Sequence, residues 1–250
     1  MNKIALITGA TSGIGAACAR IFSQNNFDLI ITGRREDRLS ELKESLELAY
    51  SNKVQTLCFD VRNREETIAV LNSIKNKNID VLINNAGLAV GVSPIDEGSF
   101  DDWDRMIDTN VKGLLNVSKT VIPWLKENGS GHIINIGSIA GKEVYPNGNV
   151  YCASKHAVDA LSQAMRIDLV KHGIKVTNIA PGMVETEFSI VRLYGDQEKA
   201  DNVYIGMEPL LPEDIAETIW FCASRPAHVN IADVLILPAS QANAVTVIRK

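Results

Sequence analysis

The sequence predicts a single α/β domain over residues 1–250, a doubly wound parallel β-sheet of about seven strands with helices on both faces. Short apolar runs rich in β-branched residues alternate with amphipathic, helix-length segments along the whole chain. Each apolar run is nearly continuous, which is typical of strands buried on both faces of a parallel sheet. The predicted strands span residues 4–8, 29–32, 54–59, 81–84, 133–137, 176–180 and 234–237.

The composition is that of an ordinary globular protein, with 46% hydrophobic and 22% charged residues among 250. A net charge of −5 disfavours nucleic acid as a partner. We expect no membrane partner, because no apolar run approaches the roughly 18 residues of a spanning helix, and the first apolar run is too short for a secretory signal. Scattered cysteines without a Cys-x-x-Cys motif predict reduced thiols, a cytoplasmic location and no metal site. They are Cys18, Cys58, Cys152 and Cys222.

The first predicted strand leads into a glycine-rich turn, Thr8-Gly-Ala-Thr-Ser-Gly-Ile-Gly15. Glycines permit a tight turn and a close backbone approach to phosphates, and the following helix directs its amides at a pyrophosphate. No Gly-Lys-Ser/Thr follows, so the turn is not a P-loop. We therefore expect a dinucleotide here; the alternative is a glycine-rich turn without a ligand. The predicted contacts are Gly9, Thr11, Ser12, Gly13, Ile14 and Gly15.

The second predicted strand ends in Thr32-Gly-Arg34-Arg35, where an NAD site usually places an acidic residue. A guanidinium instead suits the 2′-phosphate of NADP. A hydrogen bond to a charged group is worth roughly 1.5–3 kcal/mol, a ten- to hundredfold preference. The pair favours NADP (NADPH) over NAD, with a solvated helix start as the alternative. Asp60 and Val61 follow the third strand, where an adenine ring is expected.

A candidate for proton transfer follows the fifth predicted strand. Ser138 ends that strand, while Tyr151 and Lys155 lie four residues apart and share one helix face. A lysine ammonium favours the phenolate, and lowering a tyrosine pKa by roughly three units requires about 4 kcal/mol. The group would then exchange a proton with an alcohol or carbonyl oxygen. A Tyr-x-x-x-Lys pair also occurs by chance as surface packing.

The remaining elements follow from amphipathic periodicity, which predicts helices over 36–49, 65–74, 100–125, 151–172 and 213–223. Asn110 lies inside the third of these, where asparagine is unfavourable, so a specific hydrogen bond is expected.

Residues 183–211 contain no strand pattern, and a stretch of that length is often a lid. The tail, residues 239–250, has no clear partner within one subunit and is expected to pack on a neighbour or be disordered.

Taken together, these motifs resemble the short-chain dehydrogenase/reductase family over essentially the whole chain. The motifs are Thr8-Gly-x-x-x-Gly-x-Gly15, Asn84-Asn-Ala-Gly87, Asn110, Ser138, Tyr151-x-x-x-Lys155 and Pro181-Gly-x-x-x-Thr186. The resemblance implies a Rossmann-type fold, a homotetramer and a small-molecule substrate. It adds cofactor contacts at Asn85, Ala86, Gly87, Tyr151, Lys155, Pro181, Gly182, Val184 and Thr186.

The same resemblance implies a catalytic tetrad and the part that each member plays. Tyr151 would be the general acid/base, and Ser138 would orient the substrate. Lys155 would hold the ribose and lower the tyrosine pKa. Asn110 would fix a proton-relay water, and Thr186 would meet the nicotinamide carboxamide.

Further segments, among them Thr32-Gly-Arg-Arg-x-x-Arg-Leu39 and Thr186-Glu-Phe-Ser189, resemble one branch of the family. That branch holds NADP-dependent 3-hydroxy acid dehydrogenases, which act on serine, allo-threonine and 3-hydroxypropionate or malonic semialdehyde.

A carboxylate substrate needs a cation to bind it, and Arg192 in the predicted lid is the candidate. The alternative is that Arg192 is simply an exposed arginine of the lid. The competing substrates are a ketone, a sugar or a 3-ketoacyl thioester. A non-catalytic cofactor-binding protein conflicts with the intact tetrad, and a serine hydrolase lacks its Gly-x-Ser-x-Gly motif.

Overall fold

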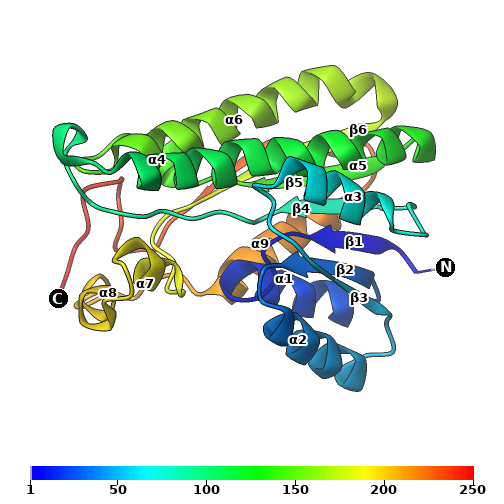
Figure 1. Cartoon of the computed structure of the whole chain (residues 1–250), viewed down its shortest axis with the longest axis horizontal. Helices are drawn as coiled ribbons and strands as arrows, with labels where there is room; N and C mark the ends of the chain where they lie inside the picture. Colours follow the sequence, from blue (N-terminus) through cyan, green and yellow to red (C-terminus); the bar gives the residue numbers. More distant parts are fainter. Residues whose placement is uncertain (1) are drawn as a thin grey trace.

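The computed structural model describes residues 2–250, which form a parallel sheet of seven strands in the order β3-β2-β1-β4-β5-β6-β7 (Figure 1). All seven predicted strands are present. The strands β2 and β3 lie on one side of β1, whereas β4 to β7 lie on the other. The loops that leave β1 and β4 therefore diverge, and sheets of this kind bind ligands at such a point. The strands are β1 (Ile4–Ile7), β2 (Asp28–Gly33), β3 (Val54–Cys58), β4 (Val81–Asn84), β5 (Gly131–Ile136), β6 (Ile174–Pro181) and β7 (Asp233–Ile236).

Two apolar cores cover the sheet because successive strand residues point to opposite faces. On β1, Ala5 and Ile7 pack toward one face, whereas Ile4 and Leu6 pack toward the other. The first face is covered by α1 (Gly13–Gln24), α2 (Glu36–Ala49) and α9 (Pro212–Ala223) (Figure 1). The second is covered by α3 (Arg64–Asn72), α5 (Leu114–Asn128) and α6 (Asn149–Leu169).

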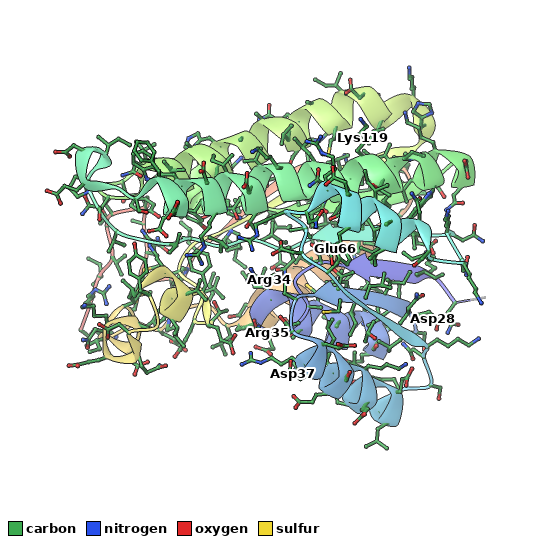
Figure 2. The ribbon with its side chains drawn as sticks, viewed as in Figure 1. Asp28, Arg34, Arg35, Asp37, Glu66 and Lys119 are labelled. Carbon is green, nitrogen blue, oxygen red and sulfur yellow. The ribbon has the colours of Figure 1, made fainter. Side chains whose placement is uncertain are left out.

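Charged side chains occupy the outer surfaces of these helices. Asp37 on α2 and Lys119 on α5 are both exposed (Figure 2). Within residues 2–250, none of the helices combines the length and the apolar character needed to cross a bilayer.

The helix predicted over 100–125 is in fact divided into three parts. α4 (Phe100–Ile107) and α5 are joined by a π-helical turn, η2 (Asp108–Gly113). Such turns are rare and occur often at functional sites. The turn contains Asn110, whose buried side chain bonds the backbone of Leu88 after β4. The apolar periodicity of the sequence does not reveal the extra residue in the π-helical turn, so the sequence predicted a continuous helix.

Residues 183–211 are more ordered than their pattern predicted. They contain two short helices, α7 (Phe188–Arg192) and α8 (Gln197–Asn202), and α8 is capped by the Asp196 side chain, which accepts from the Lys199 amide. A bridge between Val184 and Leu210 closes the base of the segment. Helices of one turn are too short to give a periodic signal, so sequence reasoning missed them.

The expectation that the C-terminal tail has no partner within one subunit was wrong, because residues 239–250 pack within the same subunit. The Gln241 side chain is buried and accepts a hydrogen bond from the Met183 amide at 2.9 Å. The Ala244 amide donates to Glu143 at 2.8 Å, and the Lys250 amide donates to the Gly206 carbonyl at 2.8 Å. Figure 1 accordingly shows the C-terminus beside α7 and α8. These contacts join irregular segments and leave no sequence pattern.

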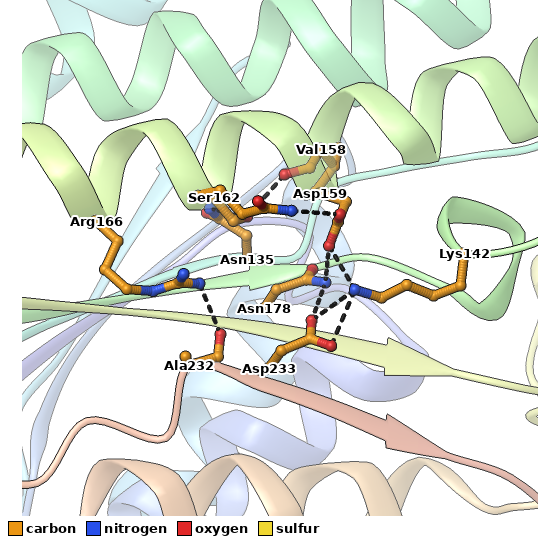
Figure 3. Close-up of polar contacts among 10 residues, drawn as sticks. Asn135, Lys142, Val158, Asp159, Ser162, Arg166, Asn178, Ala232 and Asp233 are labelled. Carbon is orange, nitrogen blue, oxygen red and sulfur yellow. Dashed lines mark hydrogen bonds and ion pairs between the residues drawn. The ribbon is translucent and has the colours of Figure 1, made fainter.

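An ion-pair cluster fastens the loop after β5 to α6 and to the edge strand β7 (Figure 3). Lys142 lies 2.6 Å from Asp159 on α6 and 2.9 Å from Asp233 on β7. The Asn178 amide on β6 donates to both carboxylates, at 3.0 and 2.7 Å. Burial opposes the Lys142 charge, but hydrogen bonds to Asp159 and Asp233 outweigh it and raise the Lys142 pKa. The cluster therefore fixes the backbone just beyond Ser138.

Replacing Lys142 with alanine should lower the free energy of unfolding by about 2 kcal/mol, because two carboxylates lose a charged hydrogen bond. Urea denaturation of the purified variant measures this change. The control is Lys119→Ala, which removes an exposed lysine from α5 and should change stability by less than about 0.5 kcal/mol. Equal stability of the two variants would contradict the role of the cluster.

Candidate active site

A cavity of about 580 Å³ lies at the carboxyl edge of the sheet, between the glycine turn and the segment that contains α7. Most of the residues selected from the sequence line this one cavity, although they come from all parts of the chain. They are Gly9, Thr11, Ser12, Gly13, Ile14, Arg34, Arg35, Asp60, Val61, Asn85, Ala86, Gly87, Ser138, Tyr151, Pro181, Gly182, Val184, Thr186 and Arg192.

The glycine turn presents an anion site to the cavity. Gly13 has a φ of +51°, a left-handed conformation that favours glycine. A Cβ at Gly15 would lie 2.4 Å from the Gly9 carbonyl oxygen, so the first turn of α1 packs too tightly for a side chain. Ser12 precedes α1 without capping it, and the first turn contains no acidic residue. The helix amides are therefore free to bind a phosphate, which is the fit expected for a dinucleotide.

The two asparagines after β4 have different surroundings. Asn85 braces the glycine turn, because its amide donates to the carbonyls of Thr8 and Gly9 at 2.9 and 3.0 Å. Asn84 points into the core and donates to Ser118 and Asn135. Of the two, only Asn85 lines the cavity.

The two arginines after β2, labelled in Figure 2, are held differently. The guanidinium of Arg35 donates to Thr11 and Ser12 in the glycine turn, each at 2.9 Å. The Arg34 side chain is 58% exposed and lies 3.7 Å from Asp60. Arg34 is therefore free to adjust to a ligand, whereas Arg35 is already placed beside the helix amides.

Sequence reasoning missed Glu187, which lines this end of the cavity. Glu187, just after Thr186, pairs with Arg35 at 2.9 Å and with Arg38 at 2.5 Å. Burial opposes the Glu187 charge, but hydrogen bonds from Arg38 and Arg35 outweigh it and lower the Glu187 pKa. No local spacing could reveal this contact, because the partners lie about 150 residues apart.

Tyr151 and Lys155 lie on one face of α6, as predicted, and both are buried. Burial raises the pKa of Tyr151, Tyr145 raises it further, and a hydrogen bond with Ser138 and the charge of Arg192 only partly oppose this. Burial also lowers the pKa of Lys155 to about 8. The expectation that Lys155 lowers the tyrosine pKa is therefore not met by the protein's own groups, because desolvation dominates.

Lys155 and Asn110 lie behind the cavity wall rather than in it. The Lys155 ammonium donates to the Ile136 carbonyl at 2.8 Å and lies 5.9 Å from the centre of the Tyr151 ring. The Asn110 side chain bonds the amide and carbonyl of Leu88, both at 2.8 Å, so its expected specific hydrogen bonds are present. A Cβ at Gly87 would lie 3.2 Å from Asn110 and 3.6 Å from Lys155. A glycine there keeps both side chains next to the cavity.

Arg192 extends from α7 into the cavity beside two tyrosines. Its guanidinium carbon lies 5.8 Å from the centre of the Tyr151 ring and 5.5 Å from that of Tyr145. Its buried Nε has no hydrogen-bond partner within residues 2–250. Tyr145 was not selected from the sequence as a site residue, since a tyrosine in a loop carries no signal of its own. The arrangement places a cation with an unsatisfied Nε donor beside a buried phenol.

The described residues contain no group of three His, Cys, Asp or Glu side chains that could hold a metal ion. A sheet of this order, an uncapped first helix and a buried Ser-Tyr-Lys set together define a dinucleotide-dependent oxidoreductase. The sequence profile described as short chain dehydrogenase matches residues 3–193, and the chain belongs to that family.

Individual relatives are similar over nearly their full lengths. The chain is 48% identical to the NADP-dependent 3-hydroxy acid dehydrogenase YdfG of Salmonella typhi, over 96% of this chain and 97% of that protein. It is 46% identical to sulfoacetaldehyde reductase 2 of Chromohalobacter salexigens, over 97% and 96%. Among solved structures, the closed form of a serine dehydrogenase complexed with NADP⁺ is 44% identical, with a TM-score of 0.93 and 99% of both chains covered.

Proposed function

We propose that the protein is an NADP-dependent oxidoreductase that interconverts the hydroxyl group of a small 3-hydroxy acid and the corresponding carbonyl. The observation that carries this proposal is the position of Arg192, whose guanidinium lies beside the buried phenol of Tyr151 and whose Nε has no hydrogen-bond partner among residues 2–250. One group can bind an acid while the other exchanges a proton with the neighbouring oxygen. Serine, allo-threonine and 3-hydroxypropionate have the required spacing of hydroxyl and carboxylate.

The cavity fits the cofactor along its length. The amides of the first turn of α1, with Thr11 and Ser12, would hold the pyrophosphate. Arg34 and Arg35 would bind the 2′-phosphate, and Asp60 and Val61 would border the adenine. Residues 85–87 and 181–186 would border the nicotinamide half. When bound, the nicotinamide accepts or donates the hydride.

The protein's own residues would handle the proton. In the reducing direction Tyr151 donates its phenolic proton to the forming alkoxide, and its raised pKa keeps that proton in place until then. Ser138, which lines the cavity together with Tyr151, would orient the substrate oxygen. The Lys155 ammonium lies 5.9 Å from the centre of the ring, and together with the charge of a bound cofactor it would favour the phenolate that remains. Asn110 joins the π-helical turn to Leu88 in the loop after β4 and would place the relay water beside Lys155.

The names of two relatives support an anionic substrate. One is a 3-hydroxy acid dehydrogenase, and the other a sulfoacetaldehyde reductase, whose substrate joins a sulfonate to an aldehyde. Both substrates pair an anion with a hydroxyl or carbonyl group, which is what Arg192 and Tyr151 would recognise. Reduction of a small sulfonated aldehyde is therefore the second candidate.

We further propose that the protein is one domain in which residues 183–211 act as a lid, and that it works as a cytoplasmic homotetramer. Its four cysteines are free. Exposed apolar side chains on α6 and β7, such as Ile167 at 75% and Leu235 at 48%, suit contacts between subunits. Light scattering of the purified protein would give four times the chain mass of 27.3 kDa; a monomeric mass would reject the tetramer.

The function is tested with 3-hydroxypropionate and its neutral counterpart 1,3-propanediol, in the presence of NADP, by following nicotinamide absorbance. The acid should be turned over with the higher kcat/KM. Arg192→Ala should raise KM for the acid about ten- to a hundredfold and leave KM for the diol nearly unchanged, because only the acid loses a charged hydrogen bond. An equal effect on both substrates would exclude Arg192 as the anion-binding group.

Tyr151→Phe should lower kcat by at least about 100-fold, because only the transferable proton is removed. NADPH affinity, measured by fluorescence titration, should stay within about twofold. Tyr50→Phe, a change at the end of α2, serves as the control and should keep full turnover. Near-normal turnover of Tyr151→Phe would refute the acid/base role.

Arg34→Ala and Arg35→Ala should each reduce the ratio of kcat/KM for NADP to that for NAD by about ten- to a hundredfold, because each removes a charged hydrogen bond to the 2′-phosphate. The matched control is Arg64→Ala, an exposed arginine at the start of α3. A ratio that stays the same in either variant rejects that arginine as a phosphate ligand.

A further inference from the structure

Tyr194, two residues beyond Arg192, ties the end of α7 to α4 on the body of the protein. Its hydroxyl donates to the Asp102 carboxylate at 2.5 Å. The Asp102 side chain is only 12% exposed and is also approached by Arg105 at 3.4 Å. The Tyr194 residue itself is 67% exposed. Burial therefore does little to hold this ring, and the hydrogen bond to Asp102 is its main fixed contact.

A backbone contact lies directly beside this hydrogen bond. The Gly91 amide donates to the Arg192 carbonyl at 3.0 Å. Gly91 has a φ of +78°, and a Cβ there would lie 2.9 Å from the Tyr194 hydroxyl. The loop after β4 thus approaches the lid closely, and its left-handed backbone at this position favours glycine. Two lid residues, Arg192 and Tyr194, are consequently bound to two neighbouring parts of the body.

The backbone of Tyr194 is strained in a way that requires these contacts. Its φ is +57°, in the left-handed region that non-glycine residues enter at a cost of about 1–2 kcal/mol. Such a conformation persists only where the surroundings hold it. A glycine follows at position 195, so the chain could relax there without the hydroxyl contact. This geometry is expected of a closure contact, here the hydrogen bond from Tyr194 to Asp102, which holds the lid against the body and can also break.

The position of Arg192 depends on this closure contact. Its Nε has no partner within the described residues, and its guanidinium lies against the rings of Tyr145 and Tyr151. Because ring faces fix a guanidinium only loosely, the backbone of Arg192 sets where its donors point. That backbone is held by Gly91 on one side and by Tyr194 two residues later.

We propose that Tyr194 and Asp102 form a latch that closes the lid and positions Arg192, so that Tyr194 is a positioning residue for acidic substrates. This latch rests on the proposed role of Arg192 as the anion-binding group. Neither latch residue takes part in the proton transfer itself. The latch therefore acts on the recognition of acids, and not on the chemistry of the hydroxyl group.

The test is Tyr194→Phe, which keeps the exposed ring and removes the hydroxyl. KM for 3-hydroxypropionate should rise about tenfold, whereas KM for 1,3-propanediol and the affinity for NADPH should stay within about twofold. Asp102→Asn retains an acceptor oxygen and should have a smaller effect. In an Arg192→Ala background, Tyr194→Phe should add nothing. Equal changes for acid and diol, or a full additional effect in that background, would overturn the latch.

Limited proteolysis separates the latch from the proposed function. Opening of the lid should expose the bond after Arg192, so trypsin should cleave Tyr194→Phe there several times faster than the parent protein, with Tyr50→Phe as the control. If Arg192→Ala leaves KM for acids unchanged, the proposed anion site fails while faster cleavage still supports the latch. Unchanged cleavage rates would refute the latch whatever the kinetics show.

Discussion

The parallel register of the seven strands is the constraint on which the rest of the structure depends. Because every strand runs in the same direction, every loop that follows a strand emerges at one edge of the sheet. The glycine turn after β1, the arginines after β2, Asn85 after β4 and Ser138 after β5 therefore meet around one cavity. None of these residues is close to the others in the sequence. The sheet therefore brings these loops together, and the loops carry the side chains that can bind a ligand or react with it.

Burial then determines the electrostatics of the site. Tyr151 and Lys155 are both buried, and burial shifts their pKa values in opposite directions, up for the phenol and down for the ammonium. With the pKa of Lys155 at about 8, the pair at neutral pH is a neutral phenol next to a cation. That state suits a general acid that must keep its proton until a substrate arrives. Formation of the Tyr151 phenolate therefore depends on the charges of bound ligands, as well as on the four-residue spacing of Tyr151 and Lys155 along α6.

The segment of residues 183–211 links the two ends of the cavity. At its base, Glu187 pairs with Arg35 and Arg38 beside the glycine turn. Further along, Arg192 reaches Tyr151, and Tyr194 reaches Asp102 on α4. The tail supports the same segment through Gln241 and Met183. Segments that looked irregular in the sequence thus connect the cofactor end of the cavity with the substrate end.

The sequence by itself determined the order of strands and helices, the glycine turn, the arginine pair and the Tyr151–Lys155 face. These are local features, because strand burial, turn formation and helix spacing depend on residues that are near one another in the chain. Only the tertiary structure decided the pairing of Glu187 with Arg38, the contact of Tyr194 with Asp102, the π-helical turn around Asn110 and the packing of the tail. The ion pair, the Tyr194 contact and the tail join distant segments through individual hydrogen bonds or ion pairs, and the π-helical turn is held by the bonds between Asn110 and Leu88. Such contacts have no period or spacing to detect. The pKa of Tyr151 was missed for the same reason, since desolvation comes from everything packed around a residue.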